Sequence, residues 1–285
     1  MEHIIHNETN NKAAPNRVPS PPVIQPVFEV KQVSFAYDGK QLALENIDMV
    51  VQAGECLAIL GANGCGKSTL LKLLDGLYFP ISGSVTAFGQ PLTEAALRND
   101  EANFAFRRRV GLVFQDTDVQ LFSPSVLDEV AFAPLQLGIP REEVTRRVES
   151  ALEMLRIEKL RDRAPHRLSG GEKRRVALAS VLTLNPDVWL LDEPTTGLDP
   201  RSQSWLVEFI LQQRQVGKTV ITATHDLVIA EQVATKIVVF NEDHRIEAAG
   251  QPQEILKNHD LLHRCNLSHY HNEVNAVHVD PVLAK

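Results

Sequence analysis

Short apolar runs separated by polar turns recur along most of the chain and predict its strands. Apolar and β-branched residues occur at strand spacing in three ranges, 27–35, 47–51 and 56–60. Three further runs are short, apolar and bounded by polar turns, namely 110–115, 188–192 and 219–224. Such runs are typical of parallel strands buried on both faces. The pattern therefore predicts an α/β fold.

Other segments have helical spacing. The stretch 68–77 has leucines at helical positions directly after a glycine-rich turn. In REEVTRRVESALEMLRI, the apolar residues Val144, Val148, Leu152 and Leu155 recur at spacings of four, four and three with charges opposite. The helical pattern extends over residues 124–180, so we expect a helical insertion inside the α/β core, over about 116–168.

Composition places the chain among ordinary globular proteins. Its 285 residues carry 29 basic and 36 acidic side chains, a net charge of −7, which argues against a nucleic-acid partner. Three cysteines without C-x-x-C spacing argue against a secreted disulfide framework and favour the cytosol. Every apolar run is shorter than the roughly 18–20 residues of a membrane span. A membrane role would therefore require a partner.

The two ends differ from the middle. Residues 1–26 hold five of the 16 prolines and are predicted to form an extended tail without a signal peptide. The folded domain is expected over 27–256, followed by a helical or irregular extension over 257–285. His259 and His263 in that extension have a spacing compatible with a transition metal, but an ordinary C-terminal helix with solvated histidines is the favoured interpretation.

A phosphate-binding motif follows the third predicted strand. The sequence GANGCGKST fits G-x-x-x-x-G-K-[ST]. Glycines let such a loop curl so that its N–H groups point inward, and the next helix adds its positive N-terminal end. The motif predicts a phosphate site made by Gly61, Ala62, Asn63, Gly64, Cys65, Gly66, Lys67, Ser68 and Thr69. In it, Lys67 reaches the terminal phosphates, Ser68 binds Mg²⁺, and the helix terminus lowers the pKa of the Cys65 thiol.

Two acidic residues end the predicted strand 188–192. Asp192 and Glu193 lie far enough after Lys67 to end another parallel strand of the same sheet. Ligand sites in open α/β sheets lie at the carboxyl ends of strands, where both motifs would meet. Successive side chains of a strand point to opposite faces, so only Asp192 is expected to bind Mg²⁺, while Glu193 polarises a water molecule.

A second glycine motif, LSGGEKRR, occupies residues 168–175. Ser169, Gly170 and Gly171 open a helical stretch and so form a second helix N-terminus suited to phosphate. Two chains arranged head to tail would explain both sites, because the Ser-Gly-Gly of one chain would then close over the phosphates held by the other.

These motifs together resemble those of the ATP-binding-cassette ATPases, over about residues 27–256. The resemblance implies a phosphate-loop core with a mixed, mostly parallel sheet, an antiparallel β subdomain and a helical subdomain. It also implies ATP and Mg²⁺ as ligands. By the same resemblance Tyr37 stacks on adenine, Gln115 touches Mg²⁺ and water, Asp199 in the loop Thr196-Gly197-Leu198-Asp199 links two nucleotide sites, and His225 contacts the γ-phosphate.

The stretch 116–139 is similar to the insertion of energy-coupling-factor ATPases of the cobalt and nickel type. It departs from that pattern at Asp116-Thr117, Val119 and Ala133, and keeps Gln120, Leu121, Phe122, Val126, Val130, Ala131, Phe132 and Pro134. Leu121 and Phe122 would line a groove for a helix of a membrane subunit. The alternative is that both fill the core of the insertion.

The resemblance implies an ATPase that powers an importer of Co²⁺ or Ni²⁺ from the cytoplasmic face of the membrane. Its expected partners are integral-membrane subunits and a second cassette, either identical or different. A vitamin importer of the same architecture is an alternative. A soluble cassette acting on nucleic acid or ribosomes is disfavoured, because the chain has a single cassette and an acidic charge. A small-molecule kinase would have no use for the LSGGE motif or His225.

Overall fold

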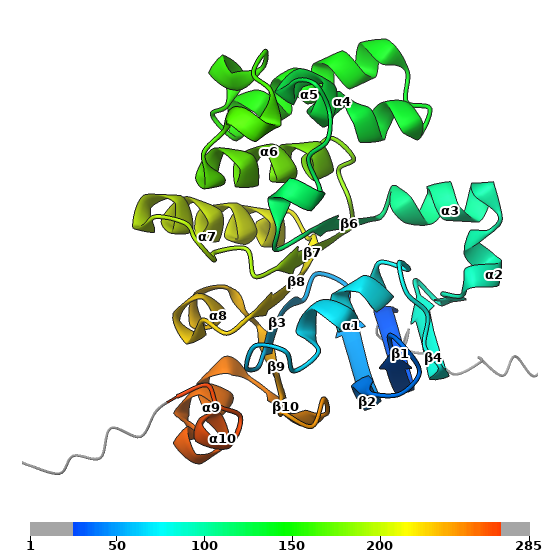
Figure 1. Cartoon of the computed structure of the whole chain (residues 1–285), viewed down its shortest axis with the longest axis vertical. Helices are drawn as coiled ribbons and strands as arrows, with labels where there is room; N and C mark the ends of the chain where they lie inside the picture. Colours follow the sequence, from blue (N-terminus) through cyan, green and yellow to red (C-terminus); the bar gives the residue numbers. More distant parts are fainter. Residues whose placement is uncertain (1–24, 269–285) are drawn as a thin grey trace, which may run out of the picture.

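The computed structural model describes residues 25–268, which form two sheets and the helices packed on them (Figure 1). The smaller sheet is antiparallel, with strand order β2-β1-β4-β5. Its strands are β1 (Pro26–Ala36), β2 (Leu42–Gln52), β4 (Ser82–Ala87) and β5 (Gln90–Pro91). Alternate residues of β2 are buried, as expected for a sheet with one face on the core.

The larger sheet has six strands in the order β10-β9-β3-β8-β7-β6. They are β3 (Cys56–Leu60), β6 (Val110–Val113), β7 (Val188–Asp192), β8 (Thr219–Thr224), β9 (Lys236–Phe240) and β10 (Ile246–Gly250). All neighbours pair in parallel except β10, which is antiparallel to β9. Every residue of β3, β7 and β8 is buried. The predicted mixed, mostly parallel fold with an antiparallel subdomain is confirmed.

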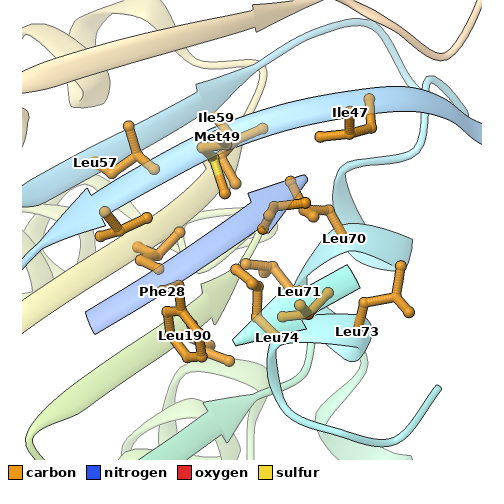
Figure 2. Close-up of a cluster of buried hydrophobic side chains, with 14 of the residues drawn as sticks. Phe28, Ile47, Met49, Leu57, Ile59, Leu70, Leu71, Leu73, Leu74 and Leu190 are labelled. Carbon is orange, nitrogen blue, oxygen red and sulfur yellow. The ribbon is translucent and has the colours of Figure 1, made fainter. Parts of the chain in front are cut away.

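The antiparallel sheet and helix α1 (Lys67–Leu74) cover one face of the larger sheet. Leucines of α1 share one apolar cluster with Phe28, Ile47 and Met49 of the antiparallel sheet and with Leu57, Ile59 and Leu190 of the larger sheet (Figure 2). Because α1 is held between the two sheets, the loop that precedes it is held in place as well.

Helices cover the opposite face of the larger sheet. Helix α6 (Gly170–Leu182), α7 (Pro200–Gln215) and α8 (Leu227–Val233) contribute to this second core with Trp189 and Leu191 of β7. Helices α4 (Val126–Gln136) and α5 (Arg141–Met154) stack above α6 in Figure 1, within the range expected for the helical insertion. Short 3-10 turns at 117–119, 158–160 and 165–167 connect them.

Helix α6 lies against the edge strand β6 at Gly111. A Cβ atom at Gly111 would lie 2.3 Å from Cγ1 of Val181, so only glycine permits this approach. Helices α2 (Glu94–Leu97) and α3 (Asp100–Arg107) join the two sheets, and α9 (Pro252–Lys257) and α10 (His259–Arg264) pack below β9.

Several elements differ from those the pattern predicts. Strand β2 begins at Leu42 rather than residue 47, because Asn46 (φ 49°) and a register shift interrupt the alternation. Helix α1 spans Lys67–Leu74 rather than 68–77, since Gly76 (φ 66°) follows its C-cap. Strand β6 ends at Val113, before Gln115. The pattern did not predict the strands β4, β5, β9 and β10 or the helices α2, α3, α7, α8 and α9.

The ends of the chain are described only in part. Pro26 belongs to β1 rather than to the predicted tail, and residues 1–24 lie outside the described residues. In the predicted extension, α10 follows α9, and residues 269–285 lie outside the described part. Among residues 25–268, no helix combines the length and apolar character needed to cross a bilayer.

Leu190 lies at the centre of this packing and has no exposed surface. We expect Leu190→Ala to lower the free energy of unfolding by about 2–5 kcal/mol, because it removes buried methyl groups and leaves a cavity. Urea unfolding followed by circular dichroism measures the loss. The control is Val216→Ala, whose side chain is 68% exposed, and which should change stability by less than about 0.5 kcal/mol. Equal losses in the two variants would contradict this account of the core.

Candidate active site

The glycine-rich loop connects the buried strand β3 to helix α1, as the motif predicts. Gly64 and Gly66 have φ angles of 84° and 110°, a region that favours glycine. A Cβ atom at Gly66 would also lie 2.4 Å from the carbonyl oxygen of Ala43. Glycine is therefore required at Gly66 both by its conformation and by the close approach of β2.

Lys67 is buried at the first position of α1 and faces a carboxylate from another strand. Its Nζ donates hydrogen bonds to the carbonyl oxygens of Gly61 (2.8 Å) and Ala62 (3.0 Å). The same atom lies 3.4 Å from Oε1 of Glu193. Both side chains are about 5% exposed. A buried ammonium group that is held by two carbonyls and one carboxylate can exchange these contacts for phosphate oxygens.

Ser68 and Asp192 form the second contact between the loop and β7. The Ser68 hydroxyl donates to Oδ1 of Asp192 over 2.8 Å. Burial raises the pKa of Asp192, and the neighbouring Glu193 adds to this, while the hydrogen bond from Ser68 lowers it. A hydroxyl and a carboxylate oxygen are ligands that Mg²⁺ prefers. The chemistry of this pair therefore fits a divalent cation.

Glu193 links Lys67 to a histidine at the end of β8. Its Oε2 lies 3.0 Å from Nδ1 of His225, and its amide donates to the carbonyl of Ala223. Within residues 25–268, the buried Oε1 of Glu193 has no hydrogen-bond partner. A buried acceptor of this kind, beside a lysine and a histidine, fits a bound water molecule or another donor.

The expectation that Asp192 and Glu193 face opposite sides is wrong. Asp192 contacts Ser68 and Glu193 lies beside Lys67, so both carboxylates face neighbouring residues at the start of α1. The reason is that β7 ends at Asp192, and Glu193 has a φ angle of 40°, outside the extended conformation that makes side chains alternate.

Tyr37 lies beside the same helix. Its hydroxyl shares a hydrogen bond of 2.8 Å with Oγ1 of Thr69, and its ring is edge-on to Phe35 and Tyr78. The side chain remains 58% exposed, which leaves ring surface available for a planar ligand. The stacking role that the resemblance implies stays a prediction.

Gln115 is exposed just beyond β6, and its side chain makes no hydrogen bond within the described residues. Its carbonyl oxygen instead accepts from Nη2 of Arg174 over 2.8 Å. Arg174 was missed by the sequence analysis, although it lies within the LSGGEKRR motif.

Ser169 and the two glycines after it lie at the N-terminus of α6. Ser169 accepts a hydrogen bond from the amide of Glu172, whose carboxylate accepts from the Ser169 amide, which completes a capping box. Asp199 caps α7 through the amides of Arg201 and Ser202. A Cβ atom on Gly171 would lie 3.5 Å from Oγ of Ser202, which donates to Asp199. The two motifs are therefore neighbours.

Neither motif hydrogen-bonds to the glycine-rich loop among residues 25–268. The predicted site residues thus fall into two groups. Lys67, Ser68, Asp192, Glu193 and His225 are joined by direct contacts, whereas Ser169, Gly170, Gly171 and Asp199 form a separate surface.

The prediction of a lowered pKa for Cys65 is wrong. Burial raises the pKa of this thiol, and that effect is larger than the opposing charge of Lys67. The side chain is 3% exposed, and its Sγ atom would lie 2.4 Å from a Cβ atom at Gly61. The thiol fills space beneath the loop rather than facing a ligand.

Leu121 and Phe122 have different environments. Leu121 is buried in the core of the helical region, so it does not line an open groove. Phe122 is 66% exposed and packs edge-on against Phe132 with ring centroids 4.9 Å apart. As for His259 and His263, residues 25–268 contain no group of three or more His, Cys, Asp or Glu side chains placed to hold a metal ion.

Comparison with known proteins assigns this arrangement to a family. The profile of the family described as ABC transporter matches residues 44–196. The nickel import ATP-binding protein NikO of Rhodobacter capsulatus is 51% identical over 245 residues, covering 85% of this chain and 96% of the relative. The energy-coupling factor transporter ATP-binding protein EcfA of Methanothermobacter thermautotrophicus is 41% identical over 241 residues, covering 85% and 76%.

Solved structures agree with these relatives. CbiO1 of Clostridium perfringens, part of the ABC transporter complex CbiONQ, superposes with a TM-score of 0.72 at 36% identity, covering 85% of this chain and 95% of that one. The ATP-binding cassette MJ0796, solved as a dimer bound to ADP and phosphate, has a TM-score of 0.70 at 29% identity, covering 79% and 98%.

The three thiols should react slowly in the native protein, because Cys56, Cys65 and Cys265 are all buried. Burial raises the pKa of all three, that of Cys56 to about 11. At pH 7 we expect a maleimide to label native protein at least about tenfold more slowly than urea-unfolded protein, where three thiols react. Mass spectrometry of the labelled peptides measures this. Rapid labelling of native Cys65 would show instead that its thiol is activated.

Proposed function

Because this chain belongs to the ABC transporter family, as an ATP-hydrolysing subunit of the energy-coupling-factor type, we propose that it powers the import of Co²⁺ or Ni²⁺. The observation that best supports ATP hydrolysis is the contact of the buried Glu193 side chain with both Lys67 and His225. The choice of Co²⁺ or Ni²⁺ as the transported ion rests on the similarity of residues 116–139 to cobalt and nickel ATPases. It also rests on the similarity of the chain to the nickel import protein NikO.

The loop residues bind ATP in this proposal. The amides of the glycine-rich loop and the ammonium of Lys67 hold the phosphates, while Tyr37 stacks on the adenine. Ser68, Asp192 and Gln115 would hold Mg²⁺, which when bound offsets the negative charge of the phosphates. The existing hydrogen bond between Ser68 and Asp192 supports the first two of these assignments.

Glu193 is the general base. It accepts a proton from a water molecule whose oxygen forms a bond to the γ-phosphorus, while the bond from that phosphorus to the bridging oxygen of ADP breaks. His225, 3.0 Å from Glu193, orients the carboxylate and contacts the γ-phosphate. Lys67 stabilises the charge on the phosphate oxygens.

Two chains complete the site. Ser169, Gly170, Gly171 and Asp199 lie together and apart from the loop, which supports the proposal that they close over the ATP of a second chain. We propose a head-to-tail homodimer. A heterodimer with a second cassette is the alternative, because each chain carries one complete set of motifs.

Integral-membrane subunits are the proposed further partners, with the chain bound at the cytoplasmic face of the membrane. The exposed pair of Phe122 and Phe132 offers an apolar contact for a helix of such a subunit. A vitamin importer of the same architecture is the alternative, since the cassette does not itself touch the transported solute.

We expect Glu193→Gln to lower the rate of ATP hydrolysis by about 10²-fold or more, because the amide cannot accept the proton. The variant should still bind ATP and elute as a dimer with it, since the other contacts remain. The control is Glu208→Gln, an exposed residue of α7, which should hydrolyse ATP at the wild-type rate. Rapid hydrolysis by a monomeric Glu193→Gln protein would contradict the assignment.

Uptake of radioactive Co²⁺ and Ni²⁺ tests the transported ion. Cells that lack the chain, and cells that carry only Glu193→Gln, should both lose uptake of one of these ions, because transport depends on hydrolysis. Restoring the wild-type chain should restore it. Unchanged uptake of both ions would overturn the metal assignment and favour the vitamin alternative.

A further inference from the structure

Arg174 is a buried cation that binds the carbonyl groups of two successive residues. Its Nη1 donates to the carbonyl of Phe114 over 2.6 Å, and its Nη2 donates to the carbonyl of Gln115 over 2.8 Å. The residue is 4% exposed. It belongs to α6, and the two carbonyls belong to the segment that follows β6. Two segments that are distant in sequence are therefore joined at one point.

The guanidinium group suits this position because its donors form a rigid, planar fork. One side chain can thus bind two successive carbonyls, which an ammonium group on a flexible stem cannot hold in the same way. Burying a cation is costly unless opposite charges lie near. Here the carboxylates of Asp192 and Asp116 act on Arg174 and offset part of that cost.

Neighbouring contacts strengthen the same connection. Oε1 of Gln120 accepts from the amide of Phe114 over 3.0 Å, and its Nε2 donates to the carbonyl of Ala177 in α6 over 3.5 Å. Lys173 pairs with Asp118 at 2.5 Å. The segment 114–120 is therefore attached to the first two turns of α6, the helix that begins directly after Ser169.

We propose that Arg174 is a positioning residue that makes the Gln115 segment and the Ser169 end of α6 move as one unit. Arg174 does not itself touch ATP. It acts through the backbone of Gln115. In the proposed dimer, Gln115 lies at the ATP of its own chain and Ser169 at the ATP of the second chain, so Arg174 fixes the two positions relative to each other. This inference rests on the proposed function for the roles of Gln115 and Ser169 toward ATP and for the docking of a membrane subunit at Phe122.

The same unit extends to the exposed aromatic pair. Glu129 of α4 is buried, and its Oε2 accepts from the amides of Phe122 (2.9 Å) and Ser123 (2.7 Å). A membrane subunit that displaces Phe122 would therefore act on a segment whose other end is held by Arg174. This gives a physical route from the docking surface to the Ser169 terminus.

Hydrogen exchange without nucleotide tests the attachment itself. In Arg174→Met, the peptide that covers residues 114–121 should exchange at least about tenfold faster, because two hydrogen bonds to a charged group are lost. The matched control is Arg147→Met, which removes a bond of 3.0 Å to the carbonyl of Thr183 at the other end of α6. It should leave exchange over 114–121 unchanged.

A double-mutant cycle tests whether Arg174 acts through Gln115. Arg174→Met alone should lower kcat for ATP hydrolysis by about tenfold or more with a smaller change in KM. In a Gln115→Ala background, the same change should have little further effect, because the two substitutions disturb one element. Arg174→Lys keeps the positive charge but lacks the planar guanidinium group. It should restore only part of the wild-type kcat and only part of the protection of residues 114–121 from hydrogen exchange.

The exchange and kinetic measurements can each contradict the proposed role of Arg174. Full additivity of Gln115→Ala and Arg174→Met, or exchange over 114–121 equal to wild type in both Arg174 variants, would overturn the proposal. An Arg174→Met protein that does not fold would leave Arg174→Lys to make the same comparison. A wild-type chain without ATPase activity, with faster exchange in Arg174→Met, would contradict the proposed function and support the attachment.

Discussion

Strand β8 pairs in parallel with β3 on one side and with β7 on the other, and the position of every reacting group follows from that pairing. Parallel strands end at the same edge of a sheet, so the loop after β3 meets the acids after β7. The backbone of three fully buried strands must satisfy its hydrogen bonds within the sheet. Their register is therefore strongly constrained, and the site inherits that rigidity.

Charge burial gives the site its chemical character. Lys67, Asp192 and Glu193 are each about 5% exposed or less, although isolated charges are costly to remove from water. Their mutual contacts offset part of this cost, but Oε1 of Glu193 lies 3.4 Å from Nζ of Lys67 without a hydrogen bond, so the compensation is incomplete. In the proposed function, phosphate oxygens would replace the contacts of Lys67, while a water molecule or a cation would complete those of the two carboxylates.

The architecture separates the two groups of residues for which we propose contacts with the nucleotide. The loop, Asp192, Glu193 and His225 are assembled by the larger sheet of one chain, whereas Ser169 and Asp199 are presented by helix termini on a different surface. In the proposed dimer, each site is made from one surface of each kind. Coupling between them then depends on how rigidly α6 is joined to the sheet, and the bonds from Arg174 join it next to Gln115.

The sequence by itself determined the features that short-range chemistry specifies. The glycines of the phosphate loop, the helix start at Ser169 and the apolar parallel strands depend on near neighbours, so their patterns predicted them. Other elements were missed: the short strands β4 and β5, the antiparallel hairpin of β9 and β10, and the long helix α7.

Only the tertiary structure decided burial. Burial raises the pKa of the Cys65 thiol, opposite to the effect expected from the helix terminus. Leu121 is buried in the core, whereas its neighbour Phe122 is exposed. The tertiary structure also joined Arg174 to a segment that lies some sixty residues earlier. Spacing along a chain specifies which faces are apolar, but it does not specify which distant surface will cover them. Desolvation and long-range hydrogen bonds arise only from that covering.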